Sequence, residues 1–233
     1  MAKRGPKPKL SEERILGVAA DLILKHGLVG LSMSAIAREL STAVSGLYRY
    51  FDSLEAVYVA LQLQAIGKYE EQFAQAREKI DADLASNQTI DLQTGALIRI
   101  LTVLRTYLRM AESHPVEQAL IDAFLSAPTP TLQDDFAARM NLELEKILQI
   151  CESSLALASE CKAISEGDHR QRTHMIWAGL HGLEHFRKRD RILPERLQVK
   201  TVEQAMMRSL LLGFGASEEA LGTANIQLNQ SLR

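Results

Sequence analysis

The chain has 233 residues, of which 46% are hydrophobic and 24% are charged, and its formal net charge is −2. This composition is typical of a globular protein with enough apolar side chains for one or two cores. No stretch approaches 18 uninterrupted apolar residues, which argues against a membrane span. The basic N-terminal stretch MAKRGPKPKLSEER has no apolar segment behind it, so we expect no secretory signal.

The two cysteines indicate a reducing compartment. Cys151 and Cys161 lie ten residues apart within a helical pattern. Because a helix rises about 1.5 Å per residue, they are about 15 Å apart, which is too far for a disulfide. We therefore expect free thiols and a cytoplasmic protein.

Residues 1–10 form a basic arm. Gly5 and the prolines at positions 6 and 8 are incompatible with a helix, so the arm is predicted to be extended. It is either a solvated tail or a segment that lies along nucleic-acid phosphates or enters a minor groove. Four cations fall in the first nine residues with no acid among them: Lys3, Arg4, Lys7 and Lys9.

Helical periodicity begins at about residue 11, and no later stretch shows sustained strand alternation. Ser11 is the predicted N-cap of a first helix, and Glu12 and Glu13 fall in its first turn, where the helix dipole favours acids. The helix is predicted to end at Gly27, because glycine readily adopts a left-handed C-cap conformation. Its apolar residues have the spacing of one buried face: Ile15, Val18, Ala19, Leu22 and Ile23.

Three further helices are predicted in the N-terminal part. Ser32 is the expected cap of a second helix, and a turn at residues 41–43 leads into a third over residues 44–50. Asp52 or Ser53 is expected to cap a fourth that runs to about residue 80. The second helix is predicted to bury Met33, Ile36, Ala37 and Leu40.

The rest of the chain also has helical periodicity, so the predicted fold class is all-α with about nine helices. We predict a small N-terminal three-helix domain over residues 11–55, a larger helical domain over 56–214, and a flexible tail over 215–233. The later helices are expected at about residues 89–112, 116–126, 131–164, 168–189 and 199–214.

The third predicted helix has an unusual outer face. Val44, Leu47 and Phe51 fall on one side and are expected to be buried. Small residues at a helix start let the backbone approach a DNA groove, while hydroxyls and a guanidinium can donate to phosphates and base edges. This is the pattern of a helix-turn-helix recognition helix, for which a plain structural bundle is the alternative. The outward residues are Ser45, Gly46, Tyr48, Arg49 and Tyr50.

The stretch IARELSTAVSGLYRYFDSLEAV, residues 36–57, resembles the signature of the tetracycline-repressor (TetR) family of bacterial transcriptional regulators. The resemblance covers about residues 11–60 and is highly specific. The matching positions are Ile36, Ala37, Leu47, Tyr48, Tyr50, Phe51, Ser53 and Glu55, and upstream Arg14, Ile15, Leu16, Ala19, Ala20, Leu22 and Gly27.

The sequence departs from the family pattern in the turn and at three single positions. The usual G-V-S turn is Ser41-Thr42-Ala43 here, so Thr42 or Ser41 is expected to cap the recognition helix in place of the missing serine. Leu54 replaces a phosphate-binding lysine, Ser34 replaces an arginine, and Arg49 replaces a histidine. These changes are expected to move phosphate affinity towards the arm and Arg49.

The resemblance implies a homodimer that binds a palindromic double-stranded DNA operator and responds to a small-molecule effector, with repression as the commoner mode. Helices 168–189 and 199–214 would form the dimer interface through Leu180, Leu183, Met206, Leu210 and Leu211. The predicted DNA contacts are Lys3, Arg4, Lys7, Lys9, Ser32, Ser34, Thr42, Ala43, Val44, Ser45, Gly46, Tyr48, Arg49 and Tyr50.

An effector pocket is expected among helices five to eight. Its candidate lining mixes apolar bulk with a few polar atoms, which suits an apolar ligand, although each such residue is more often simply part of a core. The many Leu, Ile and Met residues favour a lipophilic effector such as an acyl chain or hydrophobic drug, and no cofactor is predicted. The candidates are Tyr107, Met110, Phe124, Cys151, Trp177 and His181.

Residues 181–185, HGLEH, match the H-x-x-E-H arrangement of inverted zinc peptidases. His181 and His185 on one helix face could hold a metal, with His174 or His169 as a third ligand. This leaves two alternatives, a metal-responsive regulator using His174, His181 and His185, and a zinc hydrolase. A pocket or interface role for these histidines is preferred.

Overall fold

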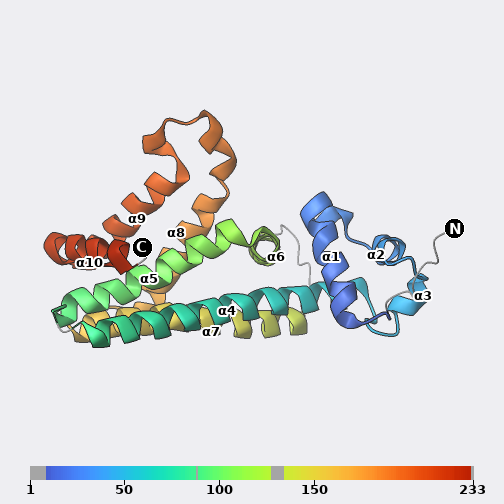
Figure 1. Ribbon diagram of the computed structural model, residues 1–233, viewed down its shortest axis with the longest axis horizontal. Coiled ribbons are helices and arrows are strands. Elements are labelled where there is room, and N and C mark those ends of the chain that lie inside the picture. Colours follow the sequence, from blue (N-terminus) through green and yellow to red (C-terminus); the bar gives the residue numbers. More distant parts are fainter. Residues whose placement is uncertain (1–8, 88, 127–133, 232–233) are drawn as a thin grey trace. The chain divides into compact units, whose positions relative to one another are not determined.

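The computed structural model describes residues 9–87, 89–126 and 134–231, and over these ranges every regular element is helical (Figure 1). The prediction of an all-α fold is therefore confirmed. The helices pack into two compact units. The first contains the chain up to residue 67 together with residues 114–143, and the second contains residues 68–113 and the chain from residue 144 onwards.

The first unit contains α1 (Glu12–His26), a 3-10 turn η1 (Leu28–Gly30), α2 (Met33–Glu39), α3 (Val44–Leu47), the start of α4 (Leu54–Ser86), and α6 (Pro115–Ser126). α1 packs on both α2 and α6, and α2 packs on α3. One hydrophobic core joins these helices, and its fully buried members include Ile15, Ala19, Ile36, Leu47 and Val57.

The predicted ends of α1 and the predicted cap of α4 are confirmed. The Ser11 hydroxyl accepts a hydrogen bond from the Arg14 N–H at 3.3 Å and so caps α1. Gly27 ends α1 with φ 69° and ψ −178°, and its N–H donates to the Ile23 carbonyl at 2.8 Å. Ser53 caps α4 by accepting from the Ala56 N–H at 3.0 Å.

The boundary predicted near residue 55 stays a prediction for the functional domains. The packing unit itself continues to residue 67, because Leu61 and Ala65 of α4 belong to the same core as α1 and α2. α6 supplies Leu120 to that core, although more than fifty residues of sequence separate Leu120 from Ala65.

The second unit contains the rest of α4, α5 (Leu92–Ser113), most of α7 (Asp134–Glu160), α8 (His169–Glu184), two 3-10 turns, α9 (Val199–Gly213) and α10 (Glu218–Ser231). The turns are η2 (Arg187–Ile192) and η3 (Glu195–Leu197). α8 packs on α9, and α10 packs along α5, as Figure 1 shows.

Three predicted boundaries in this unit are wrong. α7 ends at Glu160 instead of residue 164, because Lys162 adopts φ 59°. α8 ends at Glu184 instead of residue 189, and the Arg187 side chain folds back to pair with the Glu184 carboxylate. The predicted flexible tail is also wrong for residues 218–231, which form α10. Leu221, Ala224 and Leu228 bury one face of this helix, and Ser217 caps it.

Two glycines, Gly27 at the end of α1 and Gly17 within it, allow a matched stability test. Gly27→Ala is expected to destabilise the protein by about 1–3 kcal/mol, because its φ and ψ lie in a region almost reserved for glycine. Gly17→Ala, at an exposed position inside α1 where a Cβ meets no atom within 4 Å, is expected to stabilise it by about 1 kcal/mol. Urea unfolding measures both; equal effects would contradict this account of the α1 terminus.

Candidate functional site

α2 is positioned by its cap and its buried face. The Ser32 hydroxyl accepts a hydrogen bond from the Ala35 N–H at 3.1 Å. Met33, Ile36 and Ala37 are buried as predicted, and Leu40 is half-buried at the C-cap. Ser34 faces solvent between them. The Ser32 hydroxyl therefore serves the helix start, and Ser34 is exposed on the surface of α2.

The turn after α2 has an unusual backbone. Ser41 adopts φ 50°, a conformation that non-glycine residues avoid, and its N–H donates to the Arg38 carbonyl at 3.1 Å. The Thr42 N–H reaches back to the Ala37 carbonyl at 3.0 Å. These two bonds satisfy carbonyls at the end of α2 and turn the chain sharply into α3.

The predicted cap of α3 is wrong. Ala43 occupies the N-cap position in an extended conformation, and no side chain caps the helix. Ser41 and Thr42 belong to the end of α2 instead, which explains why their hydroxyls do not replace the missing serine. α3 is also shorter than predicted, since regular helix covers only Val44–Leu47 and residues 48–50 form turns that bring Phe51 into the core.

The outer face of α3 agrees with the pattern in the sequence. Leu47 and Phe51 are buried, Val44 is half-buried, and Ser45 and Arg49 are exposed. Tyr48 is 50% exposed. Within the described part of the chain the Arg49 guanidinium forms no ion pair, so its donors are available for an anion. A Cβ at Gly46 would come within 3.2 Å of the Thr42 hydroxyl, which explains the small residue.

Tyr50 has a structural contact that sequence reasoning missed. Its hydroxyl donates to the Leu10 carbonyl at 2.8 Å, and a guanidinium nitrogen of Arg14 donates to the Lys9 carbonyl at 3.0 Å. These bonds hold the residues that precede α1 beside α3. Lys9 is exposed there. The predicted contacts Lys3, Arg4 and Lys7 lie outside the described residues.

The candidate effector residues do not all come together. The Tyr107 hydroxyl lies 2.7 Å from His181 Nδ1, and the Trp177 ring lies 5.9 Å from the His181 ring between centroids. Met110 is buried on the same helix as Tyr107. Burial raises the pKa of the Cys151 thiol to about 12, which makes it an unreactive core residue. Phe124 belongs to α6 of the other unit, and its side chain lies outside the description.

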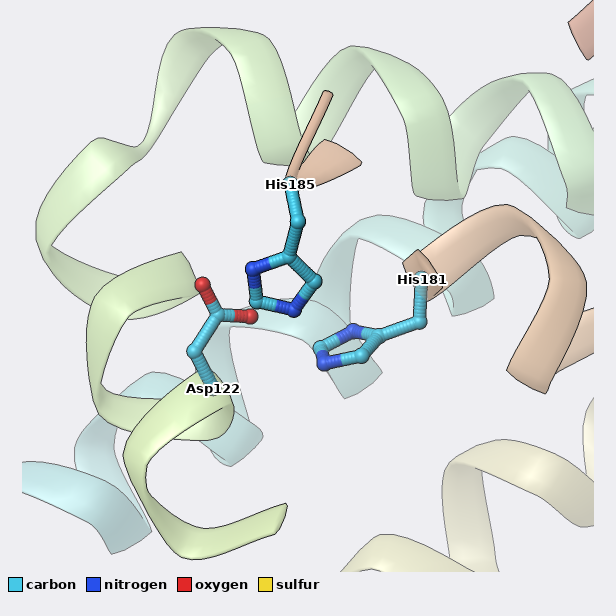
Figure 2. A group of neighbouring side chains, drawn as sticks. All are labelled: Asp122, His181 and His185. Atoms are coloured by element: carbon cyan, nitrogen blue, oxygen red, sulfur yellow. The ribbon is translucent and has the colours of Figure 1, made fainter. Parts of the chain in front are cut away.

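The HGLEH residues have structural partners. Figure 2 shows the rings of His181 and His185 at the end of α8, with centroids 5.5 Å apart and edge to face; the Asp122 drawn with them belongs to α6 of the first unit. Among the described residues, no group of three potential ligands contains His174 together with this pair. Glu184, the acid of the motif, is bound to Arg187, which favours a structural role for the motif.

Arg187 gathers three carboxylates from α5, α8 and α9. Its nitrogens lie 2.8 Å from Glu112, 2.5 Å from Glu184 and 3.2 Å from Glu203. Burial and the neighbouring Glu184 raise the pKa of Glu203 to about 7, although Arg187 opposes the shift. The sequence places Glu184 and Arg187 three residues apart, which favours their pairing, but Glu112 and Glu203 come from distant parts of the chain.

The predicted dimer contacts divide into two groups. Leu180 and Leu211 are fully buried within the unit, so they are unavailable to a partner chain. Leu183, Met206 and Leu210 remain half-exposed. The pattern missed two large exposed apolar residues nearby, Met175 at 49% and Phe186 at 48%.

The fold and the exposed α3 surface together define a helix-turn-helix protein with a second helical unit. Residues 15–61 match the family model described as bacterial regulatory proteins, tetR family. The chain is 47% identical over 47 residues to the HTH-type transcriptional repressor DrrR1 of Streptomyces coeruleorubidus, a match that covers 20% of this chain and 17% of that protein.

Solved structures extend the similarity of fold to most of the chain. AibR in complex with isovaleryl coenzyme A and operator DNA superimposes with a TM-score of 0.61, 20% identity, and coverage of 86% of this chain and 97% of that one. FadR from Bacillus subtilis in complex with stearoyl-CoA superimposes with a TM-score of 0.59 and 18% identity, and the match covers 87% of this chain and 99% of that one. The match to the TetR family model covers residues 15–61, and the similarity over the rest of the chain is one of fold.

None of the described helices is both long and apolar enough to cross a bilayer.

The missing cap of α3 gives a prediction about stability. Ala43→Ser places a hydroxyl where it can accept from the first N–H groups of α3, and we expect a gain of about 1 kcal/mol in the free energy of unfolding. Ala43→Val, which adds volume without an acceptor, is the control and should give no gain. Urea unfolding decides; equal stability of the two variants would show that the cap is not limiting.

The raised pKa of Glu203 gives a prediction about pH. The unfolded carboxyl ionises near 4.5 and the folded one near 7, so folded wild type holds the proton more tightly and loses stability as the pH rises between these values. Glu203→Gln should remove this loss, gaining about 1–3 kcal/mol relative to wild type between pH 4.5 and 8.

The measurement is urea unfolding of both proteins at pH 4.5, 6 and 8. Glu160→Gln, at an exposed position on α7, is the control and should follow the wild-type pH profile. Parallel profiles for Glu203→Gln and wild type would contradict the assignment of the proton to Glu203.

Proposed function

We propose that this chain is a ligand-responsive transcriptional repressor that binds a palindromic operator as a homodimer. The observation that carries the proposal is the exposed surface of α3, where Ser45, Tyr48 and Arg49 face solvent above a fully buried Leu47. Two-fold symmetry would place two such surfaces in successive major grooves, about 34–36 Å apart.

Each element of that surface has a distinct role in the proposal. Ser45 and Gly46 keep the start of α3 small, so the backbone can enter the groove closely. The Arg49 guanidinium can bind a phosphate or a guanine edge, and the Tyr48 hydroxyl can donate to a phosphate. Lys9, held beside α3 by the Tyr50 and Arg14 bonds, directs the basic arm along the adjacent backbone.

A lipophilic effector is the second part of the proposal. It is supported by the buried polar pair of Tyr107 and His181, which lies among apolar side chains, and by the acyl-coenzyme A ligands of AibR and FadR. Such a ligand would favour a conformation of the dimer whose two α3 surfaces no longer match the operator spacing.

The repressor role is proposed from DrrR1, which is named a repressor. Homodimerisation is proposed through α8 and α9, which keep exposed or half-exposed apolar residues including Met175, Met206 and Leu210.

Selection of genomic DNA fragments by the purified protein, at two salt concentrations, tests the proposal. We expect a palindromic site whose affinity falls steeply with salt. Arg49→Ala should weaken binding by about 1–3 kcal/mol if it contacts a base, or lower the salt slope by about one if it contacts a phosphate. Tyr48→Ala should weaken binding as well.

Arg77→Ala, at an exposed arginine of α4 in the second unit, is the matched control and should bind like wild type. Stearoyl-CoA added to the selected complex tests the effector, and release of DNA is expected. Selection of no site, or equal binding by Arg49→Ala, Tyr48→Ala and wild type, would refute the recognition surface.

A further inference from the structure

A cavity of about 650 Å³ lies in the second unit, on the side of α5 where α9 and α10 pack. None of the six candidate effector residues lines it. Its size suits a small organic molecule. Figure 1 shows the three helices that form it lying together.

Arg105 of α5 is the central charge of this cavity. Its guanidinium donates to the side-chain carbonyls of Asn229 at 2.7 Å and Asn225 at 2.8 Å, both from α10. Among the described residues it forms no ion pair, although it is half-buried. Burial lowers the pKa of Arg105, which reflects the cost of a charge that neutral amides solvate without neutralising.

The surrounding charges leave the cavity positive. Arg109 and Lys200 also line it and are exposed, and neither forms an ion pair within the described ranges. The two acids of the wall, Glu112 and Glu203, are both bound to Arg187. Arg187 carries one charge for three carboxylates and does not neutralise them all. The cavity wall is positive because its cations, Arg105, Arg109, Lys200 and Arg208, outnumber its acids, Glu112 and Glu203.

Part of the cavity wall is apolar. Leu101, Leu108, Met207 and Leu221 line the same cavity with apolar side chains. A second, smaller cavity of about 90 Å³ lies against Arg105 and Arg109 and includes Lys79. An occupant of the larger cavity therefore meets both guanidinium groups and hydrocarbon side chains.

We propose that this cavity binds an amphiphilic organic anion, with its phosphate or carboxylate on Arg105 and Arg109 and its apolar part against Leu101 and Leu221. A planar guanidinium pairs with either anion through two parallel hydrogen bonds. Asn225 and Asn229 hold the Arg105 side chain in place before the ligand arrives, which reduces the entropy cost of binding. The site is separate from both the α3 surface and the Tyr107–His181 pair.

Isothermal titration of the full chain, without DNA, tests the proposal. The probes are octyl phosphate and octanoate, which distinguish the two head groups, with octyl glucoside as the neutral molecule with the same tail and inorganic phosphate as the head group alone. We expect at least one octyl anion to bind with 1:1 stoichiometry per chain, at least tenfold more tightly than octyl glucoside or inorganic phosphate.

Variants assign the binding to this cavity. Arg105→Gln and Arg109→Gln should each weaken the octyl anion at least tenfold. Gln204→Glu adds a negative charge at an exposed position on the cavity wall and keeps Arg105 and its partners, so it should also weaken binding of the octyl anion. This variant replaces Arg105→Gln as the test if Arg105→Gln does not fold. Arg77→Gln, an exposed arginine outside the cavity, should stay within twofold of wild type.

The proposal is overturned if neither anion binds, if octyl glucoside binds as tightly, or if Arg109→Gln and Gln204→Glu keep wild-type affinity. Arg49→Ala should bind the octyl anion like wild type. Failure of this proposal and failure of the DNA-binding proposal are therefore distinguishable.

Discussion

α3 contains a single helical turn, and a helix this short has no stability of its own because nucleation costs more than its few hydrogen bonds return. Its position therefore depends on the burial of Leu47, which is fully enclosed by the core that α1, α2 and α4 share. Burying one leucine contributes about 1.5–3 kcal/mol. Everything that α3 presents to solvent is fixed by this contact and by the burial of Phe51 directly after it.

The polar contacts around α3 compensate for what its sequence lacks. No side chain caps the helix, and Ser41 adopts a left-handed backbone conformation without being glycine. The Tyr50 hydroxyl and the Arg14 guanidinium instead bind the backbone at residues 10 and 9, so the helix end and the chain entering α1 are tied together. The exposed surface of α3 is thus stabilised from its C-terminal end rather than from its start.

Much of the first unit could be predicted because its signals are local. Ser11, Ser32 and Ser53 each cap a helix as expected, and the periodic apolar residues are buried. The missing cap of α3 was not predictable from the sequence. The backbone of residues 41 and 42 forms hydrogen bonds that end α2 instead of capping α3, and this arrangement depends on how the helices pack. The role of Tyr50 was hidden for the same reason, because its acceptor lies forty positions earlier.

The prediction failed most completely for the last helix, and the cause is the same polarity that gives this helix its proposed role. α10 buries only a narrow face, Leu221, Ala224 and Leu228, and most of the rest of its sequence is polar, with two glutamates and several amide and hydroxyl side chains. Asn225 and Asn229 turn to α5 and hydrogen-bond to Arg105. A helix with a more apolar surface would have covered α5 and excluded the charge. Because α10 is polar, a guanidinium remains half-buried, solvated by amides and not neutralised, and it faces a cavity that an organic anion can fill.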